Sequence, residues 1–312
     1  MKKPLSILFA ALAALLCTAC GSSGRVCSPD GTLCLEVAER GGRIGYSVTR
    51  RGAPLLDFST LGFELLDAVW SIYNGFEPIG TLEGSTPSFT FDSPGTYRAD
   101  AKGRTADGTE HLWRIPVICD GEVAREFAWT YDDTEHTVSV SIDYLHYLDR
   151  HGRSQDIRGT VGEGSIVFAD PSDPVVAALS SKLESMASGI GLDPVETADF
   201  ILAFVQSMGS DGTKLWKYPV EVLFETSGND RSCSALYASL MSSLGYRSSL
   251  LLFPGHTAAG VEIEGSKGVF YSYYGIKYRY CECSPSSDES VGEKPEGIAN
   301  RVSMILEVRF QE

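Results

Sequence analysis

Short stretches in which apolar and polar residues alternate fill most of the chain between residues 25 and 150. Four of them are rich in β-branched and aromatic residues and cover residues 33–37, 45–49, 112–118 and 136–144. Glycine and proline punctuate the intervals between such stretches, as at residues 51–54. Short strands at this spacing predict an antiparallel, β-sandwich-like domain over residues 25–150.

From about residue 172 the apolar positions recur at helical spacing. This pattern predicts helices over residues 174–183, 195–208 and 232–244, the second opened by the capping pair Asp193-Pro194. Strand-type runs then return at residues 248–253, 258–263, 269–273, 278–283 and 304–310. Helices followed by a series of strands predict an α+β domain over residues 151–312, with helices packed on an antiparallel sheet.

The first twenty residues have the pattern of an export signal rather than of a fold. Lys2 and Lys3 precede a short apolar run, and small residues then lead to Cys20. This segment resembles a bacterial lipoprotein signal, which implies that Cys20 is lipidated and anchors the chain to a membrane of the cell envelope, periplasmic or at the cell surface. Residues 21–24 would be a linker. The alternative is an ordinary secretory peptide cut near Ala19.

Composition narrows the classes of partner. The 312 residues carry a net charge of −15, and 43% of them are hydrophobic. Nucleic-acid binding requires a basic surface, so we expect no nucleic-acid partner. The chain also has no glycine-rich phosphate loop or dinucleotide fingerprint. We therefore expect no nucleotide and no other cofactor.

Export would place the cysteines in an oxidising compartment. Without Cys17 and Cys20 the chain has an even number of cysteines, which permits disulfides. Cys27 and Cys34 flank a turn signal at residues 29–31, so we expect them to pair across a hairpin. Cys281 and Cys283 are two apart on a predicted strand, which places them on one face and poorly for bonding to each other.

Three polar residues occur along the chain in the order of a catalytic triad. Asp230 precedes the third predicted helix, His256 follows a Pro-Gly turn, and Glu282 lies on a later strand. A helix start, a strand with an imidazole and a strand with a carboxylate form a thiol–imidazole–carboxylate triad when the first residue is cysteine.

Short motifs around these residues give a family resemblance. Residues 204–207, 218–223, 228–230, 245–246, 254–256 and 280–282 occur in the order found in transglutaminase-like proteins of the papain-like superfamily. The segment from about 126 to 297 resembles that family, whose helix-start cysteine is the nucleophile. Aligned without gaps, Asp230 takes the position of that cysteine, and His256 and Glu282 match the base and the carboxylate that orients it.

The N-terminal region has a second, shorter resemblance. Residues 28–31, 45–48 and 59–65 are similar to the N-terminal β-sandwich domain of family-97 glycoside hydrolases. The resemblance implies a sandwich. It implies no glycosidase catalytic residues in this chain, because the chain has no room for that family's catalytic barrel.

The leading functional hypothesis is a domain that has lost its nucleophile. An aspartate is a poor nucleophile for amide transfer, since its acyl adduct would be an anhydride, and Asp230 at a helix start is most simply a helix cap. The domain would then bind a peptide, a glycan or a partner protein in the cleft, and would not be an enzyme.

Two alternatives remain open. Cys233, one turn into the helix, could act as nucleophile with His256 and Glu282, although a buried and inert cysteine is its simpler role. Asp230, His256 and Glu282 could instead hold a divalent metal ion. Gln206 borders the predicted cleft and is expected to support a loop. The remaining histidines have no comparable context: His111, His136, His146 and His151.

Overall fold

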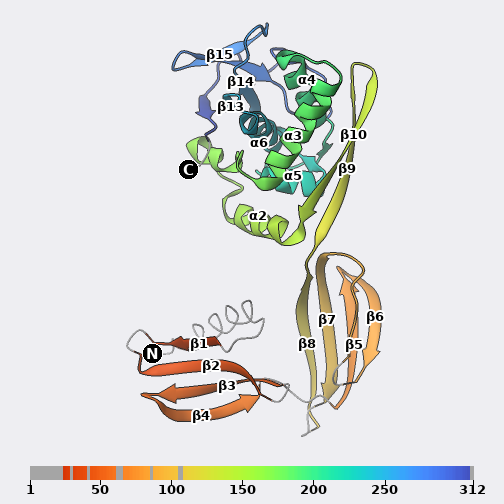
Figure 1. Cartoon of the computed structure of the whole chain (residues 1–312), viewed down its shortest axis with the longest axis vertical. Helices are drawn as coiled ribbons and strands as arrows, with labels where there is room; N and C mark the ends of the chain where they lie inside the picture. The colour runs from red at the N-terminus through yellow and green to blue at the C-terminus, as the bar shows by residue number, and fades with distance from the viewer. Residues whose placement is uncertain are drawn as a thin grey trace. The chain divides into compact units, whose positions relative to one another are not determined.

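The computed structural model describes residues 24–28, 31–40, 43–60, 66–84, 87–104 and 108–309. The chain forms two compact units, one from residues 1–90 and 97–117 and the other from residues 91–96 and 118–312. Figure 1 shows the elements of each unit. The predicted lipoprotein signal with Cys20, and linker residues 21–23, lie outside the described residues.

The first unit contains two four-stranded sheets. In one, β1 (Gly24–Cys27), β2 (Leu33–Arg40), β3 (Arg43–Arg50) and β4 (Ala53–Thr60) pair in chain order, all antiparallel. The second has the order β6 (Glu77–Glu83), β5 (Leu66–Asn74), β7 (Gly95–Arg104), β8 (Glu110–Cys119). Cys27 lies opposite Cys34 across β1 and β2 and is disulfide-bonded to it, which confirms the predicted pair.

The second unit begins earlier than residue 151, where we predicted the α+β domain to start. The hairpin of β9 (Glu122–Tyr131) and β10 (Thr134–Asp143) belongs to it, because alternate side chains such as Val138, Val140 and Ile142 are buried in the core of this unit. The alternation of apolar and polar residues predicts a hairpin with one apolar face, but it does not show which unit that face packs against. Helix α2 (Tyr144–Ile157) and the 3-10 helix η1 (Gly162–Phe168) follow, where no element was predicted.

Two helices of this unit begin directly after a capping aspartate. Helix α3 (Pro174–Gly189) starts after Asp173, and α4 (Pro194–Gln206) starts after Asp193. Each carboxylate accepts a hydrogen bond from a backbone N–H of the first turn, and a proline occupies the first helical position. The predicted start at Asp193-Pro194 is confirmed.

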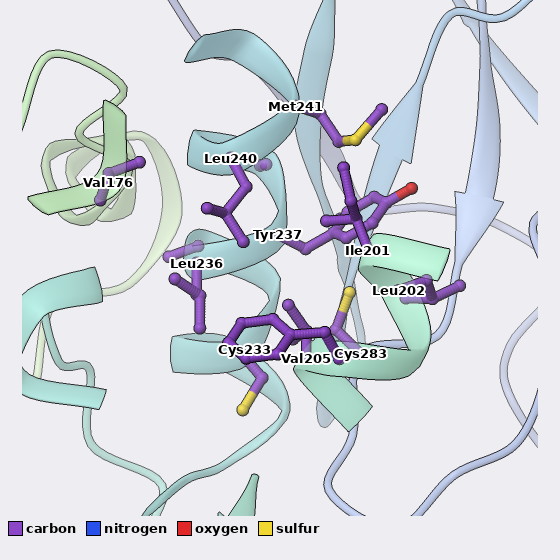
Figure 2. Close-up of a cluster of buried hydrophobic side chains, with 14 of the residues drawn as sticks. Val176, Ile201, Leu202, Val205, Cys233, Leu236, Tyr237, Leu240, Met241 and Cys283 are labelled. Carbon is purple, nitrogen blue, oxygen red and sulfur yellow. The ribbon is translucent and has the colours of Figure 1, made fainter. Parts of the chain in front are cut away.

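Helix α6 (Asp230–Ser243) forms the centre of the second unit. It packs against α3, α4 and α5 (Pro219–Glu225) and against strands of the sheet. Every residue from Ser232 to Ser242 is buried, and many of them are serine or alanine. Small side chains let neighbouring elements approach a helix closely on several sides, so this sequence suits a central position. Figure 2 shows its core side chains facing those of α3 and α4.

A five-stranded sheet of order β15-β16-β14-β13-β17 completes the unit. The strand pairings within this sheet are all antiparallel, which together with the helices confirms the α+β class. The strands are β13 (Ser248–Phe253), β14 (His256–Val261), β15 (Phe270–Tyr273), β16 (Ile276–Cys281) and β17 (Met304–Glu307). Two-residue strands β11 (Gly209–Ser210) and β12 (Ser227–Gly228) pair in parallel beside the start of α6. Among the described residues, no helix has the length and apolar character needed to cross a bilayer.

Candidate functional site

The first residue of α6 is an aspartate whose side chain does not cap the helix. Asn229 is the N-cap, and its side-chain oxygen accepts hydrogen bonds from the backbone N–H groups of Arg231 and Ser232. The expectation that Asp230 is the cap is therefore wrong. With the cap supplied by Asn229, the Asp230 carboxylate points across to β14, where Oδ2 accepts a hydrogen bond of 2.9 Å from the backbone N–H of Thr257.

His256 opens β14 directly after a two-residue turn. Gly255 in this turn has a φ of +76°, a left-handed conformation that glycine adopts without strain. The turn places the imidazole between two carboxylates. Nδ1 lies 3.3 Å from Oδ2 of Asp230, and Nε2 lies 3.1 Å from Oε2 of Glu282. The structure thus brings together all three residues that the sequence motifs selected.

Glu282 follows the end of β16 and is held by several groups. Its Oε2 accepts a hydrogen bond of 2.5 Å from the Tyr280 hydroxyl, and its Oε1 accepts one of 3.0 Å from the Ser284 backbone N–H. Gln206 on α4 donates to the backbone oxygens of Glu282 and Glu289. Gln206 supports this loop, as expected, and fixes the backbone from which the carboxylate projects.

The two carboxylates change the protonation of the imidazole. Burial lowers the pKa of His256, but its contacts with Asp230 and Glu282 outweigh burial and raise the pKa to about 9. Burial raises the pKa of Glu282, and its hydrogen bond and charge interaction with His256 outweigh this effect and lower the pKa to about 2. At neutral pH the site therefore contains an imidazolium ion between two carboxylates.

The alternative nucleophile, Cys233, is not part of this group. Its side chain is fully buried in the hydrophobic core, on the row of α6 residues that includes Leu236 and Leu240 (Figure 2). Its sulfur lies so close to Gly228 that a Cβ added there would meet it at 2.9 Å. Burial, together with the charges of Asp211 and Asp230, raises the pKa of the thiol. Such a thiol is inert, so the geometry argues against Cys233 as a nucleophile.

The same contacts argue against a metal ion at Asp230, His256 and Glu282. A single ion binds one nitrogen of an imidazole, and carboxylate ligands must converge on that same point. Here Asp230 contacts Nδ1 and Glu282 contacts Nε2, on opposite edges of the ring. The arrangement suits a hydrogen-bonded imidazolium and not a metal site.

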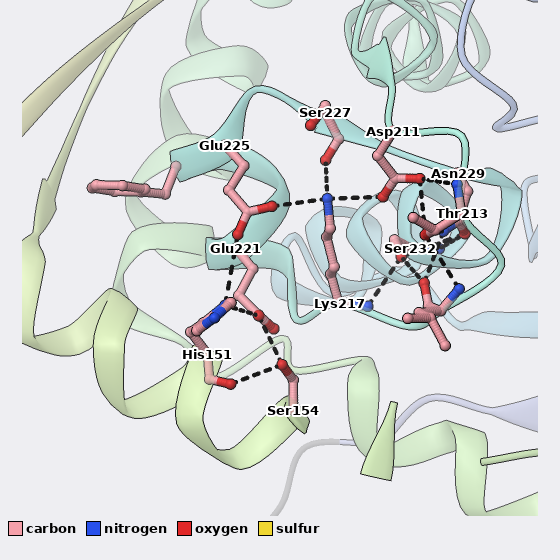
Figure 3. A network of polar contacts seen from close by, with 12 residues as sticks. His151, Ser154, Asp211, Thr213, Lys217, Glu221, Glu225, Ser227, Asn229 and Ser232 are labelled. Carbon is pink, nitrogen blue, oxygen red and sulfur yellow. Dashed lines mark hydrogen bonds and ion pairs between the residues drawn. The ribbon is translucent and has the colours of Figure 1, made fainter. Parts of the chain in front are cut away.

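Sequence reasoning missed a second group of polar residues in the same unit. His151 on α2 lies beside Glu221 and Glu225 on α5, and Lys217 connects this group to Asp211 (Figure 3). The signal was the Glu-x-x-x-Glu spacing of residues 221 and 225, because side chains four apart share one face of a helix.

A cavity of about 440 Å³ has Gln206 among its lining residues. Aromatic residues Trp129 and Tyr131 line it together with acidic and hydroxyl residues, and no lysine or arginine is among its lining residues. Trp129 Nε1 and Glu289 Oε2 are buried and have no hydrogen-bond partner among the residues that the structure describes. The cavity thus combines aromatic surface, unsatisfied polar groups and negative charge. His256 is not among its lining residues.

Comparison with known proteins gives no assignment. No family model, no curated protein and no solved structure matches this chain.

Proposed function

We propose that this chain is a transglutaminase-like domain of the cell envelope that binds its ligand without chemical turnover. In this proposal Cys20 carries the lipid anchor, residues from β1 onward form a sandwich-like domain, and the second unit is a papain-like α+β domain. The ligand is a peptide, a glycan or a segment of a partner protein.

One observation carries the proposal: the carboxylate of Asp230 lies at the start of α6 beside His256, where the resemblance to transglutaminase-like enzymes implies a thiolate. A thiolate–imidazolium pair has one negative and one positive charge, and Asp230 with His256 reproduces those charges at 3.3 Å. The backbone N–H of Thr257 further anchors the carboxylate. The substitution therefore keeps the electrostatics that stabilise the helix start and the strand, and removes the sulfur nucleophile.

The protonation of His256 supports the same conclusion. A thiolate–imidazolium pair also holds its ring protonated at rest, and its reactivity comes from the sulfur. The His256 pKa of about 9 leaves the ring protonated at pH 7. With a carboxylate in place of a thiolate, the imidazolium is a fixed cation between Asp230 and Glu282, and the pair has no sulfur nucleophile.

The cavity beside Gln206 supports ligand binding. Its volume of about 440 Å³ is within the usual range for sites that take small ligands or a few residues of a chain. The aromatic faces of Trp129 and Tyr131 with acidic and hydroxyl neighbours suit a polyhydroxyl or cationic group. Gln206 hydrogen-bonds to the loop of Glu282, so this loop connects the cavity to the His256 group.

The first test compares turnover in the natural chain with turnover after the thiol of Cys233, the alternative nucleophile, is removed. The natural chain and its Cys233→Ala variant are assayed for amidase, protease and amine-transfer activity on glutamine- and asparagine-containing peptides. We expect no turnover from either. Turnover that disappears in Cys233→Ala would overturn the proposal.

The variant Asp230→Cys tests the position itself. A cysteine at the start of α6 beside His256 should form a thiolate–imidazolium pair and react with iodoacetamide at mildly acidic pH. Peptide mapping identifies the labelled residue, and Asp230→Cys combined with His256→Ala is the matched control. Equal labelling of residue 230 in both variants would show that the imidazole does not serve this position.

The anchor is tested separately. Metabolic labelling with a fatty acid should modify the chain, and Cys20→Ala should abolish the label and release the protein from membranes. Labelling that persists in Cys20→Ala would refute the anchor without touching the proposal for the second unit.

A further inference from the structure

Two glutamates of α5 face one histidine of α2. Nδ1 of His151 lies 3.1 Å from Oε1 of Glu221 and 3.6 Å from Oε1 of Glu225. One possible ligand atom from each of the three residues lies within 4.8 Å of those from the other two. The glutamates are four residues apart, so one turn of helix presents both carboxylates to the same ring nitrogen (Figure 3).

We propose that His151, Glu221 and Glu225 bind a divalent transition-metal ion of the zinc class, one per chain. The site shares no residue with the group around His256. Its failure would leave the proposed function untouched.

The distances from the imidazole nitrogen to the two carboxylate oxygens fit such an ion. Zinc is bound by histidine nitrogen at about 2.0–2.1 Å and by carboxylate oxygen at about 2.0–2.2 Å, in a tetrahedron whose ligand atoms are therefore about 3.3–3.6 Å apart. The two distances from His151 Nδ1, 3.1 and 3.6 Å, are close to that range. An ion could enter with small side-chain movements and replace the proton on Nδ1.

Both glutamate side chains are already held by further contacts. The Ser154 hydroxyl donates to Oε1 of Glu221, and the Tyr218 backbone N–H donates to its Oε2. Glu225 accepts from the Tyr147 hydroxyl and pairs with Lys217. Metal ligands are characteristically oriented by outer hydrogen bonds of this kind. Capping of α5 explains the role of Glu221 Oε2, but it does not explain why Oε1 faces the imidazole.

The charge of the group favours a cation. Glu221 is 1% exposed, and its ion-pair partner among the described residues is His151, which carries a charge only when protonated. Lys217 lies between Glu225 and Asp211 and forms ion pairs with both. Three carboxylates and one ammonium leave two net negative charges when His151 is neutral. A divalent ion would neutralise both.

Solvent can supply the remaining ligand. The His151 side chain is 40% exposed, whereas the Glu221 side chain is 2% exposed. The site is therefore anchored in the protein on one side and open to water on the other. Three protein ligands with one open position is the arrangement of zinc sites that exchange a ligand.

The experiment measures metal binding by the full chain with zinc and cobalt(II). The chain is stripped with a chelator and titrated at pH 7.5 by calorimetry. The cobalt spectrum shows whether thiolates contribute, because thiolate ligands give a charge-transfer band that histidine and carboxylates do not. The test variants are His151→Ala and Glu225→Gln, and the matched control is His111→Ala, an exposed histidine of the first unit.

We expect one zinc ion per chain, a cobalt complex without a thiolate band, and an affinity at least about tenfold lower in both test variants, since even outer contacts of a metal site have effects of this size. His111→Ala should bind as the natural chain does. Absence of binding by the natural chain would overturn the proposal, as would binding that His151→Ala leaves unchanged. Magnesium serves as a further control and should not compete, because it prefers an all-oxygen set of ligands.

Discussion

Two histidines of the second unit each contact two carboxylates, and they differ in which ring nitrogens the carboxylates contact. Asp230 and Glu282 contact opposite nitrogens of His256. Glu221 and Glu225 converge on one nitrogen of His151. The first arrangement satisfies both N–H groups of an imidazolium and leaves no common point for an ion. The second leaves such a point. The same residue types thus form a hydrogen-bonded ion pair around His256 and a set of converging potential metal ligands around His151.

Exposure strengthens the contrast. The His256 side chain is 14% exposed and the His151 side chain is 40% exposed. Burial makes an unpaired charge costly, so the contacts of His256 should matter for folding. The His151 ring is partly exposed, and the buried Glu221 carboxylate keeps hydrogen bonds from Ser154 and Tyr218 without it, so the contacts of His151 should matter less for folding. The predictions below test this difference from the largest expected effect to the smallest.

Replacement of His256 should have the largest effect. His256→Ala leaves the buried Glu282 carboxylate and its neighbour Asp230 without their cation, which should lower the free energy of unfolding by about 3–5 kcal/mol. Urea unfolding followed by the helical circular dichroism signal measures this, because the helices of the described residues all belong to the second unit. A change as small as that of the control His111→Ala, at most about 0.5 kcal/mol, would mean that the ion pairs of His256 do not contribute to stability.

Stability should depend on pH through the same pair. The His256 pKa is raised to about 9, so its contribution is complete below the unfolded value of 6.5 and is lost as the pH rises through 9. The Glu282 pKa is lowered to about 2, so its contribution is complete above 4.5 and is lost as the pH falls toward 2. Unfolding free energies should be highest between about pH 4.5 and 6.5 and should fall by about 3 kcal/mol by pH 10.

The variant His256→Ala is the control for this pH dependence. Its unfolding free energy should vary much less between pH 6.5 and 10. If the natural chain and the variant lose stability in parallel over this interval, another group is responsible.

Removal of one of the two charges should have an intermediate effect. Asp230→Asn retains an oxygen that can accept from the Thr257 N–H but removes the charge beside Nδ1 of His256. The unfolding free energy should fall by about 1–3 kcal/mol, the usual contribution of a hydrogen bond to a charged group, and the His256 pKa should fall with it. Proton NMR of the imidazole gives the pKa, and an unchanged value would show that Asp230 does not act on the ring.

The smallest effect should come from His151 in the absence of metal. With a chelator present, His151→Ala should lower the unfolding free energy by at most about 1 kcal/mol, because the ring is partly exposed and the buried Glu221 carboxylate keeps its hydrogen bonds from Ser154 and Tyr218. Zinc should stabilise the natural chain but not this variant. A loss in chelator as large as that of His256→Ala would show that His151 is a structural ion pair and would remove the contrast between the two histidines.

The sequence predicted much of the group around His256 because each residue lies beside a recognisable local signal. Asp230 adjoins a helix start, His256 follows a Pro-Gly turn, and Glu282 lies at a predicted strand. The role of Asp230 was misjudged, since the sequence does not show which of two neighbouring residues caps a helix. Asn229 does so, and the carboxylate is left for His256.

The boundary at residue 150 and the group around His151 were not predictable in the same way. Both depend on which apolar or polar faces meet after folding. The alternation in β9 and β10 indicates a hairpin with one apolar face, and only the structure shows that α3 and α4 cover it. His151 lies on a helix that was not predicted, and its partners are about 70 residues away along the chain. The spacing of Glu221 and Glu225 indicates a shared face but not what that face meets.

The most direct test of the central claim is the protonation state of His256 in the natural chain. Nitrogen-15 NMR of the imidazole distinguishes a ring protonated on both nitrogens from either neutral form. If the His256 imidazolium lies between the Asp230 and Glu282 carboxylates in solution, both ring nitrogens are protonated at pH 7.5 and the titration has its midpoint near pH 9. A neutral ring at pH 7.5, with a midpoint at or below the ordinary value of about 6.5, would contradict it.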